Sequence, residues 1–263
     1  MWAVAFFVVT YVLTGLLWLP AIRSGQPLAT VMQGPAGLLV LLATVTPSLV
    51  AIVLAGVESG QRGIGELLGQ GIRWRFGLGW YAVAIFLTPL LWAIALAIGR
   101  IVGAGTPEVR LDFLIPVAAI GEEFGWRGYA LPRLQPRFKP LRASLLIGVV
   151  WAAWHLPYYA FPEVHPLPFA IDFSLFAVVL VSHSVMITWL YNSSGRSVLA
   201  TMIYHHSIHL ASVIPVVPGV AGGLVFALVH VGAAAATGFV SGGSLVGVRR
   251  TRSVTPSVTP ASP

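Results

Sequence analysis

Charged residues are scarce in this chain. They make up 9% of its 263 residues, and 57% of the residues are hydrophobic. A soluble domain typically carries about 25% charged residues. A folded globule with so little charge could not cover its surface with polar groups. The composition therefore excludes an ordinary soluble protein.

Cysteine is absent altogether. This excludes thiolate nucleophiles, disulfides, iron–sulfur clusters and cysteine-ligated zinc. Three further catalytic patterns are also missing from the sequence: a His-Glu-x-x-His zinc motif, a pair of aspartates within apolar runs, and the Gly-x-Ser-Gly arrangement of intramembrane serine proteases. Any hydrolytic chemistry must therefore rest on other residues.

Long apolar runs occupy most of the chain. A helix needs about 20 apolar residues to cross a bilayer. The expected spans are residues 2–20, 36–57, 79–99, 113–131, 141–161, 170–191, 197–215 and 217–240. The sequence thus predicts an all-α, polytopic transmembrane bundle of about eight spans, forming one integral-membrane domain over residues 1–245. The tail at 246–263, rich in Ser, Thr and Pro, is predicted to be disordered.

Basic residues outnumber acidic ones by 15 to 8, which gives a formal net charge of +7. Membrane topology explains this excess of basic residues better than binding to nucleic acid does. No nucleic-acid partner is expected. Basic residues collect in the cytoplasmic loops of membrane proteins. The sequence therefore predicts a multi-pass cell-membrane protein with both termini in the cytoplasm. Eleven of the fifteen basic residues follow even-numbered spans and so share one side: Arg62, Arg73, Arg75, Arg133, Arg137, Lys139, Arg142, Arg196, Arg249, Arg250 and Arg252.

Two adjacent carboxylates, Glu122 and Glu123, lie well inside an apolar run. Ionisable groups at membrane depth are costly, so they are candidates for function. Glu123 precedes Arg127 by four residues, the favourable order for an ion pair on one helix face. Glu122 points about 100° away, so it lacks this partner and is left to take a proton from water. The alternative is that both acids serve only to bridge helices.

Histidines on two other runs extend this candidate site. His155 comes shortly before Pro157, which has no N–H group to continue the helix, so the helix should break beside His155. His205 and His209 are four residues apart and project from one helix face. If these helices pack against the run that carries Glu122, the side chains form a water-holding site within the membrane.

Three short motifs resemble those of the CPBP (Abi) family of intramembrane proteases, which includes the type II CAAX prenyl endopeptidases and bacteriocin-processing or immunity homologues. Residues 122–127, Glu-Glu-Phe-Gly-Trp-Arg, are similar to the family's Glu-Glu-x-x-x-Arg motif. Residues 151–155, Trp-Ala-Ala-Trp-His, resemble its second motif, with Trp where Phe is usual. Residues 205–209, His-His-Ser-Ile-His, are similar to its third motif, His-x-x-x-Asn or Asp, with His at the last position.

The resemblance implies an intramembrane endopeptidase. Glu122 would activate the attacking water, and Glu123 and Arg127 would support the structure. His155 would stabilise the oxyanion. The active site is expected to open to the cytoplasmic half of the membrane, because Arg127 and Arg133 mark that end of its span.

The resemblance leaves the use of a metal open. His205 would hold the water together with Glu122, or would ligate zinc or another divalent metal. His209 stands where Asn or Asp is usual, and it can donate to an oxyanion or ligate the same metal. Glu122 or His155 would be the third ligand.

The expected partners are membrane lipid and a membrane-associated peptide or protein substrate. Two other functions stay open. One is a non-catalytic immunity or scaffold protein with the same fold. The other is a small proton-coupled transporter that uses Glu122, His155 and His205 as a proton relay, although the internal repeats typical of transporters are not found in the sequence.

Overall fold

The computed structural model describes residues 1–109, 115–165 and 167–247. Within these ranges the regular elements are helices, and extended backbone pairs only at one isolated bridge, between Glu108 and Val216. The chain is an all-α polytopic membrane protein, as predicted. From residue 248 onward the tail predicted to be disordered lies outside the described residues. The α-helices are α1 (Trp2–Arg23), α2 (Leu28–Val31), α3 (Pro35–Gly69), α4 (Leu78–Ile101), α5 (Ile115–Glu123), α6 (Leu131–Leu134), α7 (Pro140–Trp154), α8 (Phe169–Ser193), α9 (Val198–Leu210) and α10 (Gly219–Val240).

Five helical segments in the described ranges are long and apolar enough to cross a membrane: α1, α3 with the turn that follows it, α4, α8 and α10. The other three predicted spans coincide with shorter pieces. One is α5, which continues without a gap into the π-helix η2 (Phe124–Ala130) and α6, and the other two are α7 and α9. Residues 113 and 114 of the predicted fourth span lie outside the described residues. The short helices are the ones that carry the candidate site residues, and broken helices are tolerated at membrane depth where they are buried in protein.

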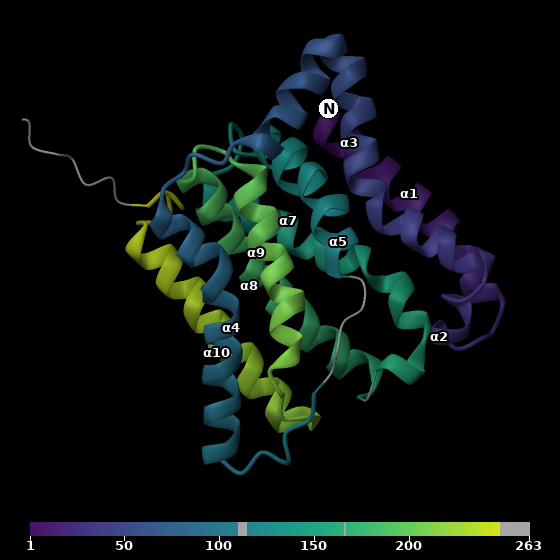
Figure 1. The fold of residues 1–263 in the computed structure, drawn as a ribbon, viewed down its shortest axis with the longest axis vertical. Helices are drawn as coiled ribbons and strands as arrows, with labels where there is room; N and C mark the ends of the chain where they lie inside the picture. The colour runs from purple at the N-terminus through teal and green to yellow at the C-terminus, as the bar shows by residue number, and fades with distance from the viewer. Residues whose placement is uncertain (110–114, 166, 248–263) are drawn as a thin grey trace, which may run out of the picture.

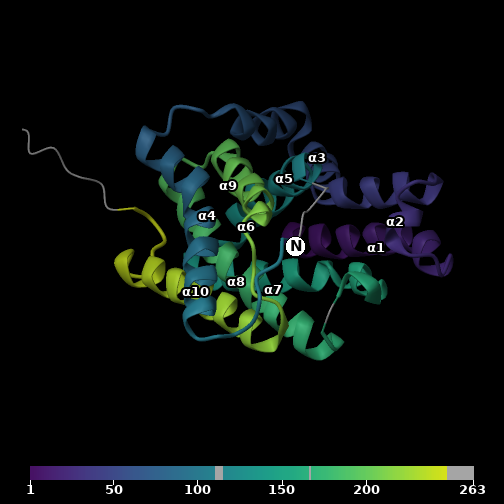
Figure 2. The ribbon, with the colours of Figure 1, turned by 60° about the horizontal axis from the view of Figure 1, so that its bottom comes forward.

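The helices form a bundle with two flanks. Helices α1 and α3 lie side by side on one flank, α4 and α10 lie on the other, and α5, α7, α8 and α9 are placed between them (Figures 1 and 2). Large aromatic side chains fill the centre, among them Trp126, Trp151 and Tyr204, each no more than 2% exposed. The flanking helices expose apolar side chains, as a surface that faces lipid should. Examples are Val4, Leu16, Leu38, Val53, Phe86 and Leu228.

Helices of alternating direction give the bundle two distinct ends. At one end Arg73 Nη1 donates to the carbonyl of Gly195 at 3.1 Å, and Arg133 forms an ion pair with Glu58. These contacts join the ends of α3, α6 and α8, and we call this the basic end. The loops after α1, α4 and α7 lie at the opposite end, where the bridge joins the loop after α4 to the loop before α10. Three further arginines predicted for the basic side lie outside the described residues: Arg249, Arg250 and Arg252.

Two glycines set the distance between α5 and α3. A Cβ atom added at Gly125 would lie 2.6 Å from the carbonyl oxygen of Pro47, and one at Gly121 would lie 2.9 Å from that of Thr44. Both distances are shorter than real Cβ contacts allow. The backbones of α5 and η2 therefore pack directly on α3, as small residues permit between membrane helices. This packing fixes the position of the two glutamates that lie between the glycines.

Candidate active site

Glu122 and Glu123 lie at the end of α5, where the backbone passes into the π-helix η2. Their exposed fractions are 2% and 0%. Short π-helical segments are rare and occur often at functional sites. Because neighbouring residues on a helix point about 100° apart, the two carboxylates face different helices. Glu122 faces α7, and Glu123 faces α9.

Glu122 is held through one of its two oxygens. Its Oε2 accepts hydrogen bonds from two indole N–H groups, that of Trp126 at 3.3 Å and that of Trp151 at 2.6 Å. Its Oε1 accepts no hydrogen bond from any residue within the described ranges. The indoles fix the orientation of the carboxylate, and Oε1 can accept a hydrogen bond from water.

Glu123 joins two helices. Its Oε1 accepts from Arg127 Nη1 at 2.8 Å, which confirms the predicted ion pair, and lies 2.9 Å from His205 Nδ1. All three side chains are buried. The sequence predicts that His205 shares a water molecule with Glu122, and this role stays a prediction. The structure places His205 against Glu123 because that carboxylate is the one that points toward α9.

The hydrogen bonds of His155 and His205 define their tautomers. His155 Nδ1 lies 2.8 Å from the carbonyl oxygen of Trp151, and His205 Nδ1 lies against the Glu123 carboxylate. Both partners can only accept, so each Nδ1 carries the hydrogen, and in the neutral ring Nε2 is then an acceptor. Each Nε2 is therefore suited to accept a proton or a hydrogen bond. The predicted role of His155 as an oxyanion donor requires its doubly protonated form.

His155 lies at the break that Pro157 predicts. Helix α7 ends at Trp154, His155 caps it, and a 3₁₀-helix, η3 (Leu156–Ala160), follows. The 15 residues of α7 place His155 about 22 Å from the start of this helix at the basic end. His155 is thus at the end of α7 that is farther from Arg133.

Trp151 contacts several of these groups at once. Besides donating to Glu122, its ring lies under the guanidinium of Arg127, with 4.5 Å from Cζ to the ring centroid, and 5.3 Å from the ring of His205. From the sequence, Trp151 is predicted only as a motif position, and its role as a hydrogen-bond donor is seen first in the structure. The sequence does contain evidence for this donor, because Trp replaces the usual Phe at this motif position and adds one N–H group.

His209 stacks on His205, as the four-residue spacing predicts. The ring centroids are 5.1 Å apart and the rings are inclined by 18°. Among the residues that the structure describes, no three His, Asp or Glu side chains are grouped closely enough to hold one metal ion. The side chains as placed therefore do not form the predicted metal site, and we derive no step through a metal.

Known proteins resemble the part of the chain that contains this site. Residues 106–211 match the family described as type II CAAX prenyl endopeptidase Rce1-like. A CAAX prenyl protease 2 from Methanococcus maripaludis is 33% identical over 109 residues, which cover 40% of this chain and 40% of that protein. The chain thus aligns with well under half the length of this curated relative. The family match encloses all six predicted site residues, from Glu122 to His209. Through this region, the chain is similar to the type II CAAX prenyl endopeptidases of the CPBP, or CAAX protease, family.

Proposed function

We propose that the chain is an intramembrane endopeptidase that cleaves membrane-associated peptides with a water molecule activated by Glu122. The observation that carries this proposal is the environment of Glu122. The carboxylate is buried, two indole N–H groups fix its Oε2, and its Oε1 accepts no hydrogen bond from a described residue. A general base must be positioned within hydrogen-bond reach of the proton that it takes. The names of the family and of the Methanococcus maripaludis relative support the same class of reaction.

The proposed reaction uses the groups around Glu122. Water donates one hydrogen bond to Glu122 Oε1 and the other to Nε2 of His205, which Glu123 orients through Nδ1. Glu122 takes a proton as the water oxygen bonds to the peptide carbonyl carbon. The C–N bond then breaks, and Glu122 returns the proton to the amine that leaves.

The oxyanion of the tetrahedral intermediate needs a donor during this reaction. His155 supplies it when both of its ring nitrogens carry hydrogen, because a neutral His155 uses its N–H for the carbonyl of Trp151, and His209 supplies a second N–H group. Arg127 is engaged with Glu123 and with the face of Trp151, so it neutralises the Glu123 carboxylate and is not the oxyanion donor.

Cleavage of membrane-peptide reporters by the purified full-length protein tests this proposal. Glu122→Gln keeps the shape of the side chain but removes the base, so we expect cleavage to fall by about 10²–10⁴-fold. The matched control is Glu163→Gln at the opposite end, where the remaining carbonyl oxygen can still accept from Leu28 N. This control should keep full activity.

Two results would contradict the proposal. Undiminished cleavage by Glu122→Gln would show that Glu122 is not the base. A wild-type protein that cleaves no peptide, and whose solute uptake is abolished by Glu122→Gln, would be a transporter instead.

A parallel cleavage reaction with a chelator tests whether a metal is needed. We expect the cleavage activity to persist in the presence of the chelator. A loss that added zinc restores would assign the site to the metalloproteases.

A further inference from the structure

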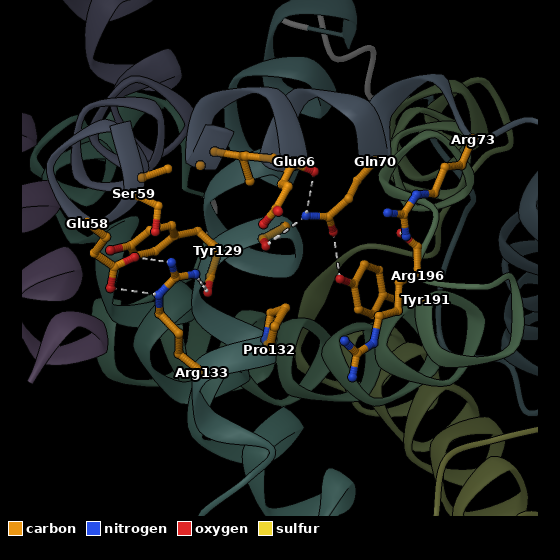
Figure 3. A pocket seen from close by; sticks show the side chains of 14 residues that line it. Glu58, Ser59, Glu66, Gln70, Arg73, Tyr129, Pro132, Arg133, Tyr191 and Arg196 are labelled. Carbon is orange, nitrogen blue, oxygen red and sulfur yellow. Dashed lines mark hydrogen bonds and ion pairs between the residues drawn. The ribbon is translucent and has the colours of Figure 1, made fainter. Parts of the chain in front are cut away.

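A cavity of about 440 Å³ lies at the basic end, outside the candidate active site. The second half of α3 and the turn after it form one wall, η2 forms another, and the turn between α8 and α9 closes it (Figure 3). Cavities of about 300–1,000 Å³ are large enough for small organic ligands. The polar side chains that line this cavity include Glu58, Glu66, Gln70, Arg73, Arg133 and Arg196.

The charges in this cavity do not cancel. Arg133 is neutralised by Glu58, and Glu66 forms an ion pair with Arg62, at 2.8 Å. Arg73 and Arg196 have no acidic partner within the described part of the chain. These two arginines lie on the same side of the cavity (Figure 3). That side therefore carries two positive charges that an anionic ligand can neutralise.

Hydrogen bonds within the protein order the part of the cavity wall next to these arginines. Tyr191 donates to Gln70 Oε1 at 2.7 Å, and Gln70 Nε2 donates to the carbonyl of Gly128 at 3.3 Å. Ser197 Oγ donates to the carbonyl oxygen of Arg73 at 2.6 Å. A ligand that binds here meets a backbone and a polar wall that are already formed, so only the arginine side chains remain to be ordered.

The surroundings of Arg73 have the composition of a membrane interface. Ile72, Trp74 and Leu78 are 77%, 59% and 86% exposed, and the guanidinium of Arg75 lies over the ring of Trp74. Exposed Trp beside Arg is typical of the level at which lipid head groups meet the protein. Basic pockets between membrane helices at this level bind phosphorylated head groups. The exposed apolar side chains next to the cavity favour a lipid over a free anion.

We propose that this cavity binds the phosphate of an anionic membrane lipid. The guanidinium groups of Arg73 and Arg196 donate to the phosphate oxygens, which suits the planar fork of arginine. The acyl chains run along the exposed side chains of Ile72 and Leu78. This site is separate from Glu122 and does not depend on the proposed protease activity.

Lipid binding to the full-length protein tests this inference. Purified protein in detergent is titrated with phosphatidylglycerol or phosphatidylcholine, and bound lipid is measured by native mass spectrometry. We expect the wild type to prefer phosphatidylglycerol, and Arg73→Gln with Arg196→Gln to weaken its binding about tenfold or more. The control is Arg137→Gln with Arg142→Gln, which removes the same charge from exposed positions at the same end outside the cavity. This control should bind as the wild type does.

A folding measurement and a second variant separate loss of lipid binding from loss of structure. Arg73 also holds the turn at Gly195, so the double variant is checked by its thermal unfolding in phosphatidylcholine alone. If it does not fold, Arg196→Gln alone replaces it, because this side chain makes no hydrogen bond to a described residue. Equal loss of phosphatidylglycerol binding in the cavity and control variants would overturn the proposal. So would displacement of the lipid by inorganic phosphate at similar concentration, which would show a site for the free anion.

Discussion

The indole of Trp151 combines an apolar ring with one polar group, and the site uses both. The N–H group donates to Glu122, while the ring contacts Arg127 and His205. Such amphipathic rings usually find a hydrogen-bond partner when they are buried. A phenylalanine at this position would keep most of the packing, but Glu122 would lose the shorter of its two hydrogen bonds.

We therefore predict that Trp151→Phe lowers kcat and leaves KM nearly unchanged. A hydrogen bond to a buried charged group is worth about 1.5–3 kcal/mol, which corresponds to about a 10- to 100-fold loss of rate if Glu122 is misplaced. Steady-state kinetics on a reporter peptide measure both constants. The matched control is Trp154→Phe, which removes another buried indole N–H, one that donates to Thr14 Oγ1 at 2.9 Å. Equal losses of kcat in the two variants would argue against a specific role for Trp151.

Local pairs in the site could be predicted from the sequence, and distant ones could not. Glu123 and Arg127 are four residues apart on one helix, so the periodicity alone predicts their contact. The contact of His205 with Glu123 depends on which face of α5 meets α9. The helical period shows which residues share a face, but it does not show which helix that face meets.

At the scale of elements, the contact of η2 with α3 determines where the two glutamates lie. This contact is close at Gly125, where an added Cβ atom would meet the carbonyl group of Pro47. Backbone atoms cannot move aside as a flexible side chain can. Any side chain at this position must therefore separate the two helices.

We predict that Gly125→Ala destabilises the protein by about 1–3 kcal/mol, the usual cost of overpacking a core. Thermal unfolding in detergent measures the change. Gly65→Ala is the control, because a Cβ atom there meets nothing within 4 Å on the exposed part of α3. This substitution should be neutral or slightly stabilising, as Ala favours a helix over Gly. Equal destabilisation by both substitutions would refute the packing argument.

The positions of the helices were largely predictable, and their internal breaks were only partly so. Apolar runs predict where each membrane helix lies, and Pro157 predicts the end of α7 beside His155. The π-helix η2 was not predicted, because nothing in its residues separates a π-helical turn from an α-helical one. Its backbone geometry arises where it packs on α3, which is a tertiary contact.

At the scale of the whole molecule, the two ends of the bundle differ in charge, and this difference predicts its orientation. We expect the basic end to face the cytoplasm. The absence of cysteine allows single cysteines to be placed at will: Arg137→Cys at the basic end and Gln26→Cys at the opposite end, both exposed. A membrane-impermeant maleimide should label Gln26→Cys on intact cells and Arg137→Cys only after lysis. The reverse pattern would invert the predicted topology.

The length of α7 determines how far the candidate active site lies from the basic end. His155 follows the 15 residues of α7, so it lies about 22 Å along this helix from the basic end. A substrate whose peptide bond reaches both Glu122 and His155 must therefore extend to a level well away from the basic end.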